Sequence, residues 1–255
     1  MPTPRRVAAG GVVNDPRWRI ARPAAAGTGS PEGCALASAR QLGYATAMTG
    51  LAALRTALQH TPPANGPVIG DPLRAAVCAV IAGPEHAPSL CLIRRARWQG
   101  DPWSEHIALP GGRRSGDEAP PETARRELRE EVGIDVPEAD LVPLPQLRVR
   151  LAGRERLLLL DPFVYLAGAA PPLAAGPEID LAFWLPVAAL WDLGHATCHV
   201  LHDGETLLYP AIRTPHGLIF GITLRVLTLL SDQLGVPLPM LEEIPQLRRA
   251  SGAPR

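Results

Sequence analysis

The chain has 255 residues, 46% of them hydrophobic, which suffices for one sizeable domain with extensions or for two small domains. Its 25 basic and 25 acidic residues cancel, so its overall charge favours binding neither to nucleic acid nor to a membrane surface. The longest apolar stretch, from Leu157 to Gly176, contains Asp161 and three prolines, which suit strands and turns rather than a membrane helix. The four cysteines contain no C-x-x-C pair and the N-terminus has no apolar signal-peptide core, so we expect a cytoplasmic protein with buried thiols.

The first part of the chain divides into an extension and a helix. Residues 1–45 are rich in Ala, Gly, Pro and Arg without hydrophobic periodicity, which predicts a disordered extension. Leucines then recur at helical spacing between Met48 and His60, before the breaker "TPPANGP". We therefore expect a lead-in helix over 46–62, a main domain over 71–240 and a tail over 241–255.

Short apolar runs on both sides of one central helix predict a mixed α/β domain. We expect a hairpin from Ala75–Ala82 and Ser89–Ala96, and a buried strand over Leu157–Ala167 that pairs with the alternating segment from Leu147. Further along, the sequence predicts a strand within 180–193 that Pro186 turns into a helix, a strand at "LLYPAI", and a C-terminal helix within 217–235 whose Leu224, Leu227 and Leu230 face inward.

The segment "HATCHVLH", from His195 to His202, raises the question of a zinc site. On a helix its histidines and cysteine would share one face. The turn signal "HDGE" and the strand "TLLYPAI" follow at once, however, so a hairpin is favoured. Because successive strand residues face opposite sides, we expect no zinc site here.

The segment Pro110–Ile134, "PGGRRSGDEAPPETARRELREEVGI", predicts an acidic helix over about 121–132. Two prolines are tolerated in the first helical turn, and Gly133 stands where a left-handed C-terminal cap is needed. Glu127, Glu130 and Glu131 then span about a third of the circumference, beside an apolar arc that can pack on a sheet.

The alternative interpretation is a solvated charged face, in which an Arg126–Glu130 surface salt bridge contributes about 0.3–0.5 kcal/mol. This alternative explains the helix but not the glycine-rich loop before it. At about 4 Å each like-charged pair costs roughly 1 kcal/mol in water and roughly 4 kcal/mol at an effective dielectric of 20. Mg²⁺ prefers hard oxygen ligands and binds few carboxylates together with substrate phosphates. The cluster therefore predicts a cradle for divalent cations.

The spacing from Gly112 through Glu118 and "REL" at 126–128 to Gly133-Ile134 resembles the box of the Nudix hydrolase family. We call Gly112–Ile134 the box. The resemblance implies an α/β/α sandwich with a mixed sheet and Mg²⁺- or Mn²⁺-dependent hydrolysis of a nucleoside diphosphate linked to another moiety. It also implies roles: Glu127 and Glu131 as principal metal ligands, Glu130 as a further ligand or the base, Glu118 reaching the metals from the loop through water, the Gly111 carbonyl completing the coordination, and Arg126 holding the glutamates. Glu178 stands where some members carry a catalytic glutamate, and a solvated loop acid is the alternative.

Looser similarities point to the coenzyme A diphosphatase branch. "LCLIRRA", "HIALPGG", "DPFVYL" and "IFGITLRVL" resemble its segments, which implies cleavage of CoA or acyl-CoA into 3′,5′-ADP and a phosphopantetheine. Glu105 and Trp103 stand where that branch has a glycine and a histidine, so ADP-ribose, dinucleoside polyphosphates and damaged nucleotides remain alternatives, as does a non-catalytic nucleotide sensor. Arg95, Arg97 and Trp103 are expected to bind the substrate, with Arg97 pairing with phosphate. Trp98 or Trp103 stacks on a base, or the tryptophans are ordinary packing residues. We expect a monomer or homodimer with a small-molecule substrate and no nucleic-acid or membrane partner.

Overall fold

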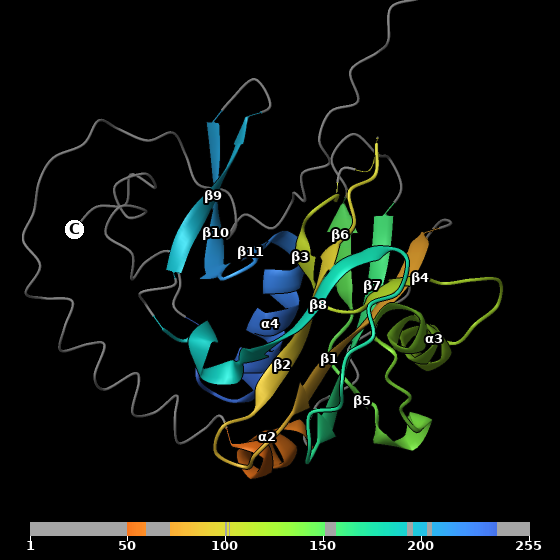
Figure 1. Cartoon of the computed structure of the whole chain (residues 1–255), viewed down its shortest axis with the longest axis vertical. Coiled ribbons are helices and arrows are strands. Elements are labelled where there is room, and N and C mark those ends of the chain that lie inside the picture. Colours follow the sequence, from red (N-terminus) through yellow and green to blue (C-terminus); the bar gives the residue numbers. More distant parts are fainter. Residues whose placement is uncertain are drawn as a thin grey trace, which may run out of the picture.

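The computed structural model describes residues 50–59, 72–99, 101, 103–150, 157–192, 196–202 and 206–238. The expected extension over 1–45 and tail over 241–255 lie outside these residues. Within them, strands form one eight-stranded mixed sheet and one three-stranded sheet, with helices on both faces of the larger sheet (Figure 1). This arrangement confirms the predicted α/β/α sandwich.

Strand β1 (Leu73–Ala82) organises the larger sheet. It runs parallel to β7 (Leu157–Ala167) along its whole length. Its hairpin with β2 (Ser89–Arg95) is confirmed, but these two strands pair only close to their turn, at Ile81–Leu90 and Ala82–Ser89. Beyond that point β4 (Gly111–Arg113) pairs with β1 instead, which places the glycine pair within the sheet.

The remaining strands extend the sheet on either side. β3 (Ile107–Ala108) and β8 (Ile179–Pro186) pair with β2. On the other side, β5 (Val142–Pro143) and β6 (Leu147–Arg150) pair antiparallel with β7, which confirms the predicted partnership around Leu147. A short 3₁₀ turn, η2 (Glu138–Asp140), precedes β5.

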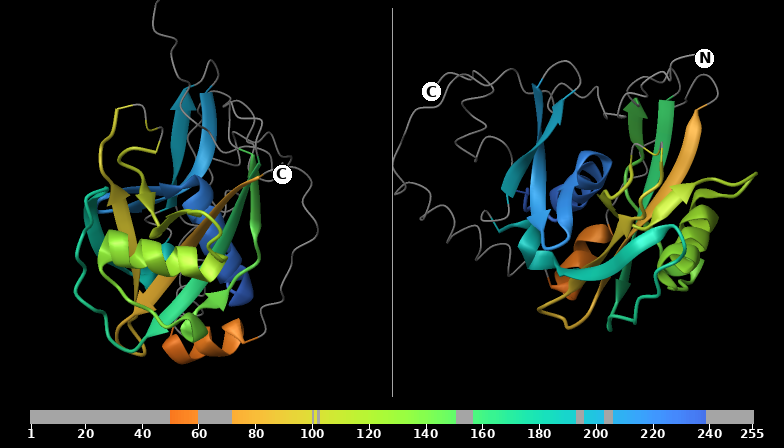
Figure 2. Two further views of the ribbon diagram at one scale, coloured as in Figure 1. Left: turned by 90° about the vertical axis from the view of Figure 1, so that its right-hand side faces the viewer. Right: turned by 45° about the horizontal axis from the view of Figure 1, so that its top comes forward.

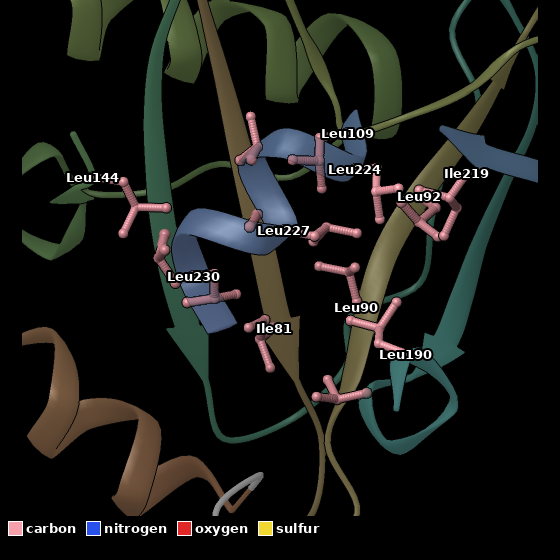
Figure 3. Packing of buried hydrophobic residues seen from close by; sticks show 14 of the residues in the cluster. Ile81, Leu90, Leu92, Leu109, Leu144, Leu190, Ile219, Leu224, Leu227 and Leu230 are labelled. Carbon is pink, nitrogen blue, oxygen red and sulfur yellow. The ribbon is translucent and has the colours of Figure 1, made fainter. Parts of the chain in front are cut away.

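Two hydrophobic cores lie on the two faces of the sheet because side chains alternate along β1. The first core packs beneath α2 (Leu51–Leu58) and α4 (Gly221–Gln233) and contains the three inward leucines predicted for the C-terminal helix (Figure 3). The second core packs beneath α3 (Pro120–Val132). Figure 2 (right) shows α3 and α4 on opposite sides of the sheet.

Two predictions near the C-terminal end are corrected. The helix expected after Pro186 is a single 3₁₀ turn, η3 (Val187–Leu190). The helix expected from residue 217 begins only at Gly221, because Gly217–Phe220 forms β11 and pairs with β10 (Thr206–Thr214). The same β10 pairs with β9 (Ala196–His202), which confirms the hairpin predicted there, although His195 lies outside the described residues.

No helix in the described part of the chain is both long enough and apolar enough to cross a membrane.

Candidate active site

Helix α3 has the boundaries that its sequence predicts to within one residue. At its start the Ala119 N–H donates to the Glu122 carboxylate at 2.7 Å, which satisfies a backbone donor that the helix leaves open. At its end Gly133 adopts a left-handed conformation with φ 72°, and the Ile134 N–H donates to the Leu128 carbonyl at 3.2 Å. The predicted cap is therefore confirmed, and the helix is fixed at both ends.

The apolar arc of α3 determines where its acids lie. Ala124, Leu128 and Val132 are all fully buried in the second core against β1. Glu127 and Glu131 flank this arc at i and i+4, so they are carried to the edge of the helix that faces β4. Glu131 is only 5% exposed.

The two glycines before the helix allow these acids to approach the backbone. The Gly111 N–H donates to Oε2 of Glu131 at 2.7 Å. A Cβ atom on Gly112 would lie 2.5 Å from Oε1 of Glu127, so only glycine leaves room for that carboxylate. Gly111 itself has φ 146°, and a Cβ there would lie 2.3 Å from the carbonyl oxygen of Ala76.

Arg126 gathers the other acids of the box. Its guanidinium lies 2.7 Å from Glu118, 2.9 Å from Glu127 and 2.8 Å from Glu130, and it also donates to the Arg113 carbonyl at 2.9 Å. The Arg126–Glu130 pair is thus one contact of a larger network.

The Arg126 guanidinium holds the pKa of Glu118 down at about 2, helped by hydrogen bonds from the Ser115 N–H and the Thr123 hydroxyl. In this arrangement Glu118 is an ionised anchor for Arg126.

Burial has the opposite effect on the two acids nearest the glycines. It raises the pKa of Glu131 to about 8, against the hydrogen bond from Gly111, and the nearby Glu127 raises it further. Burial likewise raises the pKa of Glu127, although Arg126 opposes that change. These carboxylates therefore lie in a site where ionisation is costly without a further positive charge.

Arg95, at the end of β2, borders the same cluster. Its Nη1 lies 4.0 Å from Oε1 of Glu131, and its Nη2 lies 3.4 Å from Asp101. Its Nε is buried and has no hydrogen-bond partner in the described part of the structure. Glu178 also belongs to the surroundings of this cluster. Its backbone carbonyl accepts the Ala96 N–H at 2.9 Å, and its charge raises the pKa of both Glu127 and Glu131.

The loop between β2 and β3 holds the other residues singled out from the sequence. Arg97 is 83% exposed and its Nε lies 3.9 Å from Glu105. Glu105, where the CoA branch has a glycine, takes a left-handed backbone with φ 63°. Trp103 packs half-buried against the first core, whereas Trp98 is 59% exposed. Sequence reasoning missed Asp101, which links this loop to Arg95, because a lone aspartate carries no local signal.

The donor set suits a hard divalent cation. Among the described residues, no group of three or more His, Cys, Asp or Glu side chains is already arranged to hold a metal ion. The contacts with Gly111 and Arg126 use Oε2 of Glu131 and Oε1 of Glu127, so each of these carboxylates retains a second oxygen. Carboxylate oxygens around a glycine backbone are the ligand type that Mg²⁺ and Mn²⁺ prefer.

Comparison with known proteins shows the family to which the chain belongs. A model of the NUDIX domain matches residues 72–206, which is more than half of the chain. The chain belongs to the Nudix hydrolase family. An uncharacterized protein of Schizosaccharomyces pombe is 36% identical over 165 residues, covering 56% of this chain and 49% of that protein, so the chain spans about half the length of this relative.

Solved structures of Nudix proteins are also similar. A MutT/nudix family protein from Enterococcus faecalis is 16% identical, with a TM-score of 0.49, over 88% of this chain and 81% of that one. The NUDIX domain of Shewanella oneidensis NrtR, solved with ADP ribose, is 15% identical, with a TM-score of 0.40, over 47% of this chain and 76% of that one.

Proposed function

We propose that this Nudix protein hydrolyses the diphosphate linkage of a nucleoside diphosphate derivative with the help of Mg²⁺ or Mn²⁺. One observation carries the proposal: the carboxylate of Glu131 is buried beside that of Glu127, while the Nε of Arg95 next to them has no hydrogen-bond partner among the described residues. Buried like charges need a cation, and an unpaired buried guanidinium nitrogen needs an acceptor oxygen. A cation together with a bound phosphate meets both needs.

The metal ligands in this proposal come from the box and from Gly111, which directly precedes it. Glu127 and Glu131 are the principal ligands, the Gly111 carbonyl completes the coordination, and Glu130 and Glu118 supply further oxygens, the latter through water. A bound divalent cation supplies Lewis acidity toward the diphosphate and lowers the pKa of water.

The remaining groups bind, position and accept a proton. Arg126 keeps Glu118, Glu127 and Glu130 within reach of one another through its ion pairs. Arg95 and the exposed Arg97 contact phosphate oxygens. For the proton released by the attacking water, the proposed base is Glu130, with Glu178 as the alternative.

CoA or an acyl-CoA is the proposed substrate, with 3′,5′-ADP and a phosphopantetheine as products. The support is the resemblance of the flanking segments and the left-handed turn at Glu105, which keeps the backbone conformation that suits the glycine of that branch. ADP-ribose belongs in the same tests, as do dinucleoside polyphosphates and damaged nucleotides. Cys78 and Cys91 are free and buried, which supports the proposed cytoplasmic location; the protein is proposed to act as a monomer or homodimer.

A substrate screen tests the proposal directly. Purified protein is incubated with CoA, acetyl-CoA, ADP-ribose, NADH and diadenosine polyphosphates in Mg²⁺ or Mn²⁺, and products are identified by mass. Glu130→Gln and Glu131→Gln should each lower kcat by at least about 100-fold. Glu138→Gln, an exposed acid on η2, is the matched control and should retain activity.

Each outcome of the screen is informative. Release of 3′,5′-ADP from CoA supports the assignment of CoA as the substrate. Faster hydrolysis of another diphosphate would make that compound the assigned substrate instead. Wild-type turnover in both box variants contradicts the proposed site. Metal-dependent nucleotide binding without any product makes the protein a nucleotide sensor instead of an enzyme.

A further inference from the structure

We infer that Trp98 is the stacking surface for the nucleobase of the substrate; the inference rests on the proposed function and specifies how that site recognises its nucleoside. Among the described residues, Trp98 is the one large hydrophobic side chain that is exposed. A single exposed apolar residue needs no special explanation on its own. The argument therefore depends on how the surrounding loop is built and where it is attached.

The backbone of Trp98 is fixed although its ring is exposed. The Trp98 N–H donates to the Ser104 hydroxyl at 3.0 Å, and that hydroxyl donates back to the Trp98 carbonyl at 2.8 Å. The same carbonyl accepts the Asp101 N–H at 3.2 Å. An indole presented from an anchored backbone loses little entropy when a planar ligand stacks on it.

The loop uses its two tryptophans differently. The side chain of Trp103 packs against the first core, and the backbone N–H of Trp103 donates to the Asp101 carboxylate at 3.0 Å. Trp103 therefore has the role of an internal anchor, which leaves Trp98 as the aromatic ring available to a ligand. We therefore assign the stacking role to Trp98 instead of Trp103.

The loop is attached directly to the candidate metal site. The Asp101 carboxylate that receives the Trp103 N–H lies 3.4 Å from Arg95, and Arg95 lies 4.0 Å from Glu131. Trp98 is three residues after Arg95, so their Cα atoms are at most about 11 Å apart. A nucleoside joined through its ribose to a diphosphate at Arg95 can reach that far. The loop is drawn in yellow at the upper left of Figure 2 (left).

The local charge favours a nucleotide over an apolar peptide as the occupant. The side chain of Arg97, next to Trp98, is 83% exposed, and its nearest acid is 3.9 Å away. A cation beside an exposed indole matches a ligand that combines an aromatic ring with phosphate. Because stacking needs only a π-face, recognition through Trp98 should tolerate different bases.

Paired ligands isolate the contribution of the base. Binding of AMP and of ribose 5-phosphate, which share the sugar and phosphate but differ in the base, is measured by calorimetry with Mg²⁺ present. For Trp98→Ala the Kd of AMP should rise about 5- to 150-fold while that of ribose 5-phosphate stays unchanged. Trp98→Phe should restore most of the AMP affinity, and His86→Ala, an exposed residue in the turn at the other end of β2, should match wild type.

Kinetics separate this inference from the proposed function. With the diphosphate that the screen identifies, Trp98→Ala should raise KM by the same factor and leave kcat unchanged. Equal AMP affinity in wild type and Trp98→Ala overturns the inference, as does an equal loss for ribose 5-phosphate. If wild type hydrolyses nothing but binds AMP through Trp98, the proposed function falls, and Trp98 is the base-stacking residue of a nucleotide-binding site that has no hydrolytic activity.

Discussion

Replacing Gly112 by alanine should damage catalysis without unfolding the protein. The new Cβ would lie 2.5 Å from Oε1, 2.7 Å from Cδ and 2.9 Å from Oε2 of Glu127. Ordinary contacts begin near 3.4 Å, so the carboxylate has to move by about 1 Å. The displaced atoms are the end of a flexible side chain, so the cost to folding is small. A displacement of about 1 Å in a catalytic constellation can lower the rate by about 100-fold.

Two further glycine variants make this test specific. Gly168→Ala places its Cβ in open space and should match wild type in both activity and stability. In Gly111→Ala the new Cβ would lie 2.3 Å from the backbone carbonyl oxygen of Ala76, and the alanine would have to adopt the φ of 146° found at Gly111. This variant should therefore fail to fold normally. Thermal unfolding and kcat with Mg²⁺ are measured for all three. Gly112→Ala with a normal Tm and full activity would refute the assignment of Glu127 as a metal ligand.

Two other predictions concern stability. Burial raises the pKa of Glu131 from 4.5 to about 8, so its protonated form stabilises metal-free wild type fully below pH 4.5, and this stabilisation is lost as the pH rises through about 8. In EDTA, the Tm of Glu131→Gln minus the Tm of wild type should therefore increase as the pH rises from 4.5 to about 8. A Tm difference that stays constant over this pH range would contradict the burial argument. Leu54→Ala, at a fully buried position of α2, should cost about 2–5 kcal/mol in urea unfolding, and an unchanged midpoint would show that α2 does not belong to the domain core.

The sequence predicted α3 well because its signals are local. The prolines of the first turn, the capping glycine Gly133 and the apolar arc all act within a few residues of one another. The buried leucines of α2 were predicted for the same reason. Elements defined by their own periodicity and caps do not depend on distant partners.

The short strands were missed because their existence depends on partners elsewhere in the chain. β3, β4 and β5 have two or three residues each, too few to show an alternating pattern. Gly217–Phe220 continues without a break into the apolar helix, and only its pairing with β10 separates the two. A continuous run of apolar residues gives no sequence signal of such backbone pairing.

The site was predictable as a set of residues but not as a geometry. Spacing along one helix placed Glu127 and Glu131 on neighbouring turns, and the structure brings both to the glycine pair. The approach of Arg95 to Glu131 joins positions 36 residues apart, so the motif suggested only that Arg95 binds substrate. The difference in burial between the two loop tryptophans likewise depends on the first core, against which only Trp103 packs among these two.

The network around Arg126 explains how the protein tolerates so many acids before a cation arrives. One guanidinium contacts Glu118, Glu127 and Glu130, and Glu118 is held ionised as its permanent partner. Glu131 lies outside these contacts and is the acid whose pKa burial raises most clearly. A cation bound beside Glu131 would therefore offset the largest cost of ionisation among these carboxylates. It would also disturb few of the ion pairs that Arg126 makes. Because such binding requires the ionised carboxylate, affinity for the cation should strengthen as the pH rises toward 8.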